Sequence, residues 1–364
     1  QWCDNGGRRV RVSKRHYERQ VWVFGDRNKT MEEERMTEDI FGVEKLSDDL
    51  KKSAGLLTAS QARYLVDYYY KIQDDRIRAA GQVRSSEAEE PIDWIDFVYR
   101  QLFALENRIK SALGIYSLST ELGQWSRSIT GIGPVLSAGL LAHIDITKTA
   151  HPGSLWRLAG LDPTSKWIGS DAAKKLVAEK IVSRGKVSKE QILDLAVMSN
   201  RNPVLLEKMA VSYNKKEGDT KVTTTNLAKA LARRPWNAQL KVIQWKIGES
   251  FVKVQSKEGG KFYGEFYAQR RALEEARNDD MLNEVEALDK AKTVGKSTDA
   301  YKSYSIGKFP PGHLYSRAKR WVVKLFLSHY HHVAHEIHYG KPPERPWIIT
   351  HGGHSDFIPP PNWR

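Results

Sequence analysis

The run GIGPVLSAGLLAHIDI, residues 131–146, constrains the fold more than any other part of this sequence. It places two glycines around an isoleucine, directly before a proline and an apolar segment. Proline is favoured in the first turn of a helix, and glycine allows turn conformations that other residues rarely adopt. We therefore expect a tight turn that leads into a buried helix beginning near Pro134.

This turn is also a candidate DNA-binding site, formed by Gly131, Ile132, Gly133 and Pro134. The first N–H groups of a helix have no partner inside it, and the helix dipole places partial positive charge there. Because glycine has no Cβ atom, a phosphate can approach those N–H groups closely. The turn therefore predicts a helix-hairpin-helix, a motif that holds one strand of duplex DNA without reading its sequence. A glycine–proline helix start packed into an ordinary core is the alternative.

The charge balance agrees with a polyanionic partner. The 364 residues carry 58 lysines and arginines against 44 aspartates and glutamates, a formal net charge of +14. Such a chain attracts nucleic acid and releases it as salt rises, although a solvated basic surface without a specific partner has the same charge count. Double-stranded DNA is the expected partner, and RNA is a second candidate.

Other features exclude several classes of protein. No apolar run approaches the roughly 18 residues of a membrane span, and the first residues lack the order of a signal peptide. Cys3 is the single cysteine, which excludes an internal disulfide and a thiolate zinc cluster. We expect a cytoplasmic, nucleoid-associated protein with no membrane partner.

The apolar spacing predicts a mainly α-helical fold. The expected order is a basic arm over residues 1–57, a long helical hairpin over 58–123, a DNA-binding domain over 124–253 with a helical insertion at about 171–232, and a charged helical region with a proline-rich tail over 254–364. The hairpin helices pair within one chain or, as a coiled coil, between two copies in a homo-oligomer.

Capping residues mark several of the expected helix starts. Thr58 with Gln61, and Ser188 with Gln191, have the spacing of a capping box. Gly160 is expected to end a short helix that contains Leu155 and Leu158. A set of basic residues that we expect to contact DNA phosphates lies ahead of the helix expected in RRPWNAQLKVIQWKIGESFVKV and continues into that helix. Its members are Arg233, Arg234, Lys241 and Lys246.

Histidines are concentrated near the C-terminal end. His331, His335 and His338 are four and three residues apart, so they share one face of the expected helix at a spacing compatible with a metal site. The order HExxH is not present, and neutral packing or phosphate contacts explain these histidines more simply. We assign no metal site to them.

Three segments together resemble the C-terminal domain of the insertion-sequence one-ten/one-sixteen/nine-oh-two transposases: GIGPVLSAGLLAHID, LWRLAGLDP and RPWNAQLKVIQWKIGESFVK. The resemblance covers about residues 124–170 and 233–253. It implies DNA binding and strand exchange by a serine nucleophile, together with a RuvC-like N-terminal domain whose four acidic residues hold magnesium. The stretch before the helical hairpin is short and poor in strand patterns, so no magnesium ligand is carried over to this chain.

The same resemblance places the nucleophile in the loop after Gly-Leu-Asp-Pro. Ser170, next to Gly169, is the nearer match, and Ser165 is the alternative. The sequence thus predicts a transposase-like protein of a mobile element or phage that acts in DNA transposition or recombination. The competing hypotheses are a catalytically inactive DNA-binding or architectural protein and a basic helical scaffold for another protein. No cofactor is assigned, and magnesium is expected only if the protein is catalytic.

Overall fold

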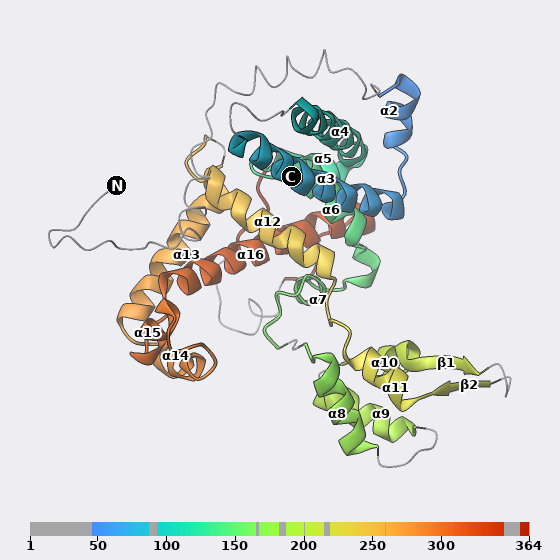
Figure 1. Cartoon of the computed structure of the whole chain (residues 1–364), viewed down its shortest axis with the longest axis vertical. Helices are drawn as coiled ribbons and strands as arrows, with labels where there is room; N and C mark the ends of the chain where they lie inside the picture. Colours follow the sequence, from blue (N-terminus) through green and yellow to red (C-terminus); the bar gives the residue numbers. More distant parts are fainter. Residues whose placement is uncertain are drawn as a thin grey trace. The chain divides into compact units, whose positions relative to one another are not determined.

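The structure is a computed structural model that describes residues 46–86, 93–164, 167–181, 187–199, 201–214, 219–258, 260–345 and 357–363. The described residues are mainly helical, with one two-stranded sheet, which confirms the expected fold class (Figure 1). Most of the basic arm expected over residues 1–57 lies outside the described ranges. No described helix combines the length and the apolar character needed to cross a bilayer.

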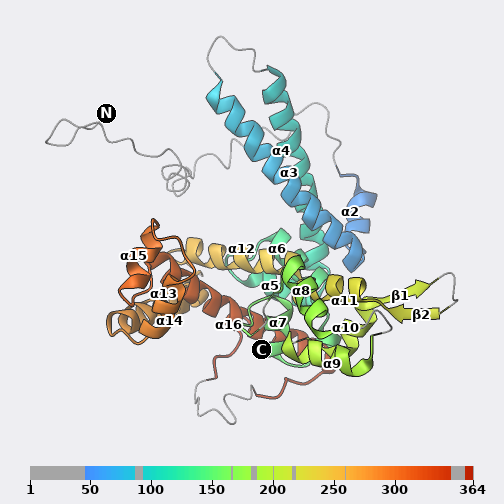
Figure 2. The ribbon, with the colours of Figure 1, turned by 60° about the horizontal axis from the view of Figure 1, so that its bottom comes forward.

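The chain divides into two compact units. The described residues of the first, 71–86 and 93–108, belong to the long helices α3 (Ala59–Ser85) and α4 (Asp93–Leu118). Both helices lie within the expected hairpin, and Figure 2 shows them side by side.

Within this unit the two helices run antiparallel. Gln73 Nε2 donates to Glu106 Oε1 over 2.9 Å, Arg76 forms an ion pair with the same carboxylate, and the Arg76 guanidinium lies over the Phe103 ring. Helix pairing therefore occurs inside one chain.

The second unit contains residues 46–70 and the described residues from 109 onward. Before the insertion its elements, besides parts of α3 and α4, are α2 (Asp48–Ala54), α5 (Glu121–Ser128), α6 (Pro134–His143), the 3₁₀ helix η2 (Ile146–Lys148) and α7 (Pro152–Leu158). After the insertion they are α12 (Ala238–Val254), α13 (Lys261–Asp279), α14 (Glu284–Ala291), α15 (Asp299–Ser305) and α16 (Pro311–Tyr339). Helix α6 begins at Pro134, as expected from the sequence.

Helix α16 is the central element of this unit, because it packs against α5, α7, α12 and α13. Its buried residue Phe326 stacks on Trp125 of α5 and meets Phe251 of α12 edge to face. Tyr263 of α13 stacks on Phe251 at 4.6 Å between ring centroids. One aromatic cluster thus holds four helices together, and α5, α12 and α13 are fixed relative to α16 through it.

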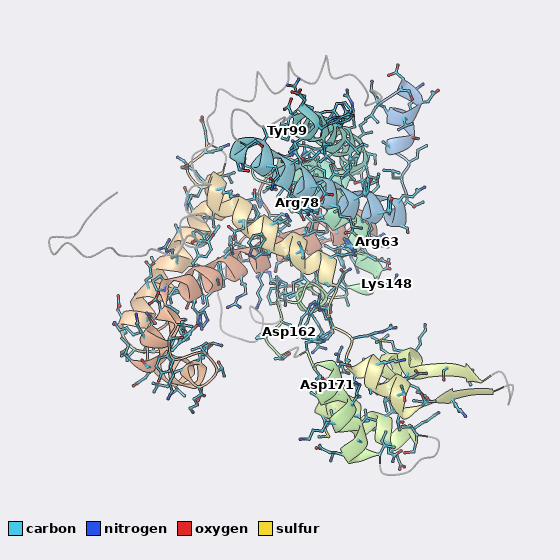
Figure 3. The ribbon with its side chains drawn as sticks, viewed as in Figure 1. Arg63, Arg78, Tyr99, Lys148, Asp162 and Asp171 are labelled. Carbon is cyan, nitrogen blue, oxygen red and sulfur yellow. The ribbon has the colours of Figure 1, made fainter. Side chains whose placement is uncertain are left out.

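Helices α6 and α12 run antiparallel. Ser250 Oγ donates to the carbonyl oxygen of Gly131 over 2.6 Å, whereas His143, at the other end of α6, contacts Asn237 at 3.1 Å. Between these ends a Cβ atom on Gly139 would lie 2.7 Å from Ile243 Cδ1, so Gly139 leaves the space that the Ile243 side chain occupies. Arg63 of α3 donates to the carbonyl oxygen of Ala142 over 2.7 Å (Figure 3).

The insertion, residues 170–232, forms a core of its own. Its elements are α8 (Ser170–Lys180), α9 (Lys189–Met198), α10 (Pro203–Ala210), β1 (Val211–Asn214), β2 (Asp219–Val222) and α11 (Thr224–Leu231). Leu195, Leu206 and Leu227 are buried together in that core. The strands pair antiparallel, with Val211 opposite Val222, and were not expected from the sequence. The capping boxes at Thr58 and Ser188 are both formed.

The described end of the chain, residues 357–363, lies against α5 and α16. Trp125 Nε1 donates to the carbonyl oxygen of Pro361 over 2.9 Å, and Asn362 Nδ2 donates to the carbonyl oxygen of Ser128 over 3.2 Å. His329 Nε2 contacts the carbonyl oxygen of Ile358 at 2.9 Å. The proline-rich tail is therefore attached next to the residues that lead into the GIGP turn.

Candidate nucleic-acid interface

Residues 129–133, which we call the glycine turn, join α5 to α6. Gly131 has a φ of 99°, a conformation that strains any residue with a side chain. A Cβ atom there would also lie 3.1 Å from Ser250 Oγ and 3.2 Å from Val254 Cγ2 on α12. Gly131 is therefore required by the backbone and by packing, whether or not a phosphate approaches it.

Ile132 differs from its expected role. Its side chain is 3% exposed, and its N–H already donates to the carbonyl oxygen of Ile129 over 2.9 Å. Neither group is available to a phosphate, so Ile132 anchors the turn in the core. The sequence alone could not distinguish an isoleucine that anchors the turn in the core from one that contacts a phosphate. In either role the residue lies between the same two glycines.

Gly133 and the start of α6 form the open part of the turn. The first hydrogen bond of α6 runs from Ser137 N–H to Gly133 O over 3.0 Å, so the N–H groups of Val135 and Leu136 have no partner inside the helix. Pro134 has no N–H, and Gly133 makes no side-chain cap. These two N–H groups are suited to an anion that approaches along the helix axis.

Arg127 brings a cation to this helix start. A Cβ atom on Gly133 would have Arg127 Nη1 as its nearest neighbour, 4.0 Å away. The Arg127 Nε is buried without a hydrogen-bond partner in the described part of the chain, and burial lowers the pKa of its guanidinium. A guanidinium beside free helix N–H groups is an arrangement that favours phosphate.

The two glycines should respond differently to the same substitution. We expect Gly131→Ser to lower the free energy of unfolding by roughly 1–3 kcal/mol, because serine is strained at positive φ. Gly133→Ser should leave it nearly unchanged, since the N-cap φ of −81° suits serine, which is a good N-cap residue. Urea unfolding of the two variants measures the difference, and equal stabilities would contradict the assigned roles.

The predicted basic residues do not gather around the glycine turn. Gly131 packs against Ser250 and Val254 near the C-terminal end of α12, whereas Lys241 is nine residues before Ser250, about 14 Å along the helix. Lys246 lies 4.0 Å from the centre of the Tyr70 ring. The structure therefore separates the sequence-predicted residues into two groups at opposite ends of α12.

Arg234 and Lys241 belong to a larger group that the sequence did not reveal. We define the cation–indole cluster as Arg234, Lys241, Arg320, Lys324, Trp156, Trp167 and Trp236. Three of its cations lie over indole rings: Lys241 over Trp236 at 3.9 Å, Lys324 over Trp156 at 5.2 Å and Arg234 over Trp167 at 5.6 Å from the ring centres. Its members come from α7, α12, α16 and the segments beside them.

The indoles are fixed by hydrogen bonds and by Gly160. Trp156 Nε1 donates to the carbonyl oxygen of Lys324 over 3.1 Å, and Trp167 Nε1 donates to that of Ala232 over 2.8 Å. Gly160 follows α7 with a φ of 68°, and a Cβ atom there would lie 2.9 Å from both Lys241 and Trp236. Gly160 thus ends α7, as expected, and also lets the loop pack closely against the cluster.

The charges of the cluster are not neutralised within the described part of the chain. Burial lowers the pKa of Lys241, and the nearby charges of Arg234 and Arg320 lower it further. Burial also lowers the pKa of Lys324, where Arg320 acts in the same direction and Asp162 opposes it. Figure 3 marks Asp162 in the connection between α7 and α8, where it also accepts from Arg157 over 3.2 Å. Two lysines whose pKa values are lowered by neighbouring arginines indicate a local concentration of positive charge.

Arg233 is exposed beside the cluster, and its carbonyl oxygen accepts a hydrogen bond from Arg201 of the insertion. Ser170 is the first residue of α8, is exposed, and follows Trp167 by three residues. Ser165 lies outside the described residues. Ser170 is therefore the candidate nucleophile that the structure describes, and it lies at the positive end of a helix dipole.

The C-terminal histidines make contacts inside the protein. His331 Nε2 lies 2.7 Å from the carbonyl oxygen of Thr149, and His335 Nδ1 lies 3.0 Å from that of Lys341. Across the described ranges, no group of three His, Cys, Asp or Glu side chains could hold a metal ion. The side chains described here therefore do not fit the magnesium site that the transposase resemblance implies.

Comparison with protein-family models, curated proteins and solved structures finds no match to this chain. Function must therefore be inferred from the glycine turn and the cation–indole cluster. The three segments that resemble transposase sequences form α6, α7 and α12 with their flanking loops, and all three helices belong to the second unit.

Proposed function

We propose that the protein binds nucleic acid through its backbone and is a transposase-like DNA-binding protein. The observation that carries this proposal is the cation–indole cluster, whose four cations have no ion-pair partner in the described ranges. Arg234 and Arg320 lower the pKa of Lys241, and Arg320 lowers that of Lys324. A polyanion that bridges these cations relieves their repulsion and releases its own counterions.

The glycine turn supplies the second contact with DNA. Helix α5, the turn and α6 follow the order of a helix-hairpin-helix, in which a duplex phosphate sits at the start of the second helix. The N–H groups of Val135 and Leu136 and the Arg127 guanidinium would hold that phosphate. Contacts of this kind read no base edges, so we expect binding that depends strongly on salt and little on sequence.

Gly133→Val tests the contact at the glycine turn. The added side chain enters open space apart from Arg127, so the variant should fold while blocking the approach of a phosphate. We expect its affinity for a fluorescent 20-base-pair duplex, measured by anisotropy, to fall on the order of tenfold, the loss of charge-assisted hydrogen bonds. Gly81→Val is the matched control, because a Cβ there also meets no atom within 4 Å. Unchanged affinity in a folded Gly133→Val protein would remove the turn from the interface.

Strand exchange is a second proposed activity, favoured by the position of Ser170 at the start of α8. In the expected step the Ser170 oxygen forms a bond to phosphorus, and the displaced sugar oxygen leaves and takes up a proton. Magnesium would offset the developing charge, but its ligands must come from outside the described ranges.

A covalent adduct with supercoiled DNA, formed in the presence of Mg²⁺, would show this chemistry. We expect the adduct to vanish in Ser170→Ala and to persist in Ser165→Ala. An adduct that survives both substitutions would exclude this loop. No adduct in the wild-type protein would favour the non-catalytic DNA-binding alternative.

Self-association through α4 is proposed as a further property of the same protein. Although α3 and α4 pair within the chain, Trp94 remains 79% exposed and Phe97 48% exposed. Large exposed aromatic side chains on a helix commonly mark a protein interface. We expect Trp94→Lys with Phe97→Lys to convert any dimer seen by sedimentation velocity into a monomer, and a mass unchanged by these substitutions would place the interface elsewhere.

A further inference from the structure

Trp167 is the exposed indole of the cation–indole cluster. Its side chain is 52% exposed, whereas Trp156 and Trp236 are half-buried. Its Nε1 is bound to the carbonyl oxygen of Ala232, which fixes the ring, and the Arg234 guanidinium lies over it. A large aromatic surface is thus held in a defined orientation in contact with solvent, although burying it would favour folding.

We propose that Trp167 is a stacking platform for an unpaired base, so that the cation–indole cluster takes single-stranded polynucleotide. This inference rests on the proposed nucleic-acid binding and specifies which form of nucleic acid the cluster holds. Bases inside a duplex stack on one another, and an indole can reach a base face only where the base has left the stack. The exposed ring therefore selects a strand whose bases are free.

The surrounding charges complete the site for such a strand. Arg234 lies over the Trp167 ring, and its positive charge also lowers the pKa of Lys241, a second cation of the cluster. The charge of Arg320 lowers the pKa of both Lys241 and Lys324. A stacked base at Trp167 thus has a row of unpaired cations beside it for the phosphates of the same strand. Aromatic platforms beside a basic groove are the usual means of holding single strands without sequence preference.

Trp245 provides the matched comparison within the same chain. Its indole is 58% exposed, close to the value for Trp167, and a lysine, Lys319, lies 5.3 Å from its ring centre. That lysine, however, forms an ion pair with Glu249. Trp245 therefore combines an exposed indole with a neutralised cation, and we assign no base to it.

The test uses the full chain and three fluorescent probes: a dT 12-mer, an rU 12-mer and a 12-base-pair duplex. We expect Trp167→Ala to weaken binding of at least one single strand on the order of tenfold and to change duplex affinity less than twofold. Trp245→Ala should change neither. Trp167→Phe retains an aromatic face and should recover most of the lost affinity. A loss confined to dT or to rU identifies the strand as DNA or RNA, and a loss on both identifies a polynucleotide of either sugar.

Other outcomes would overturn the inference. Equal losses on duplex and single strands would mean that Trp167 only supports the surrounding structure. A Trp167→Phe protein that melts like the wild type and binds as poorly as Trp167→Ala would exclude stacking. If the wild-type protein binds duplex but neither single strand, this inference fails alone, whereas binding to none of the three probes would also remove the proposed function.

Discussion

Lys241→Gln combined with Arg320→Gln is expected to weaken DNA binding on the order of a hundredfold at low salt. Each cation that contacts a phosphate of a single strand contributes roughly 0.7 to the slope of log affinity against log salt, so the double variant should reduce that slope by about 1.4. Anisotropy titrations of the dT 12-mer at several salt concentrations measure both quantities. Lys292→Gln with Lys302→Gln removes the same charge from lysines paired with Asp289 and Asp299 and is the matched control.

The same double variant should not be less stable than the wild type. Arg320 lowers the pKa of both Lys241 and Lys324, which means that these cations repel one another in the folded protein. Removing two of the four charges relieves that repulsion, so the melting temperature should stay level or rise. Lost binding in a protein of undiminished stability would show that the charges serve a ligand rather than the fold. If the double variant loses no more affinity than the control pair, the cluster contributes to binding only through the net charge of the protein.

Local chemistry in the sequence predicted the helix starts and ends well. Pro134 begins α6, Gly160 ends α7, and the boxes at Thr58 and Ser188 form as their spacing required. These helix ends depend on hydrogen bonds and backbone conformations within a few residues of the chain. They can therefore be predicted from the neighbouring residues in one sequence. The hydrophobic periodicity of residues 58–123 likewise predicted two long helices there, and it left open whether they pair within one chain or between two.

The cation–indole cluster could not be predicted because its parts are distant in the chain. Lys324 meets Trp156, 168 residues earlier, through packing of α16 on α7. Nothing local marks Arg320 or Lys324 as partners of Arg234. The sequence did select Arg234 and Lys241 as phosphate contacts, but it did not show their distance from the glycine turn, which packs at the other end of α12.

Isolated sequence signals also fail where one residue type has two physical roles. Gly131 and Gly133 are equivalent in the pattern GIGP, yet one is required by a positive φ and the other is open to solvent. The short strands β1 and β2 were missed because Val211–Asn214 and Asp219–Val222 are only four residues each and lie between strong helix signals. The backbone conformation in the structure is what distinguishes the two glycines and reveals the two strands.

Acidification from pH 6.5 to pH 5 is expected to destabilise the protein through buried histidines. His143 is 8% exposed and His329 3% exposed, and burial lowers the pKa of each from 6.5 to about 4. Arg63 adds to the effect at His143. His313, which is half-buried, has its pKa lowered to about 4 mainly by burial as well.

The direction follows from which state binds protons. Between pH 6.5 and pH 4 the unfolded chain protonates these histidines and the folded protein does not, so unfolding takes up protons and stability falls as the pH falls. Above pH 6.5 both states are neutral at these positions and the effect is absent. Over the window from pH 6.5 to 5, each of the two buried rings should contribute about 2 kcal/mol, and the half-buried His313 less.

Burial lowers the pKa of His329, although its hydrogen bond with Ile358 acts in the opposite direction, and its contacts define the neutral form. Its Nε2 lies 2.9 Å from the carbonyl oxygen of Ile358 and therefore carries the proton, which leaves Nδ1 as the acceptor for the Tyr263 hydroxyl at 2.9 Å. A second proton on Nδ1 would remove that acceptor and place a charge in an apolar site beside the aromatic cluster. His329→Gln keeps polar atoms near both positions but does not titrate.

Urea unfolding at pH 7, 6 and 5 measures the effect above the range in which most carboxylates titrate. The wild type should lose several kcal/mol across this series, and His329→Gln should lose about 2 kcal/mol less than the wild type while starting from a lower stability at pH 7. His151→Gln, a change at an exposed histidine, is the control and should follow the wild type. If the three proteins lose the same stability, the buried histidines already carry protons in the folded state, and the neutral contacts assigned to His329 are wrong.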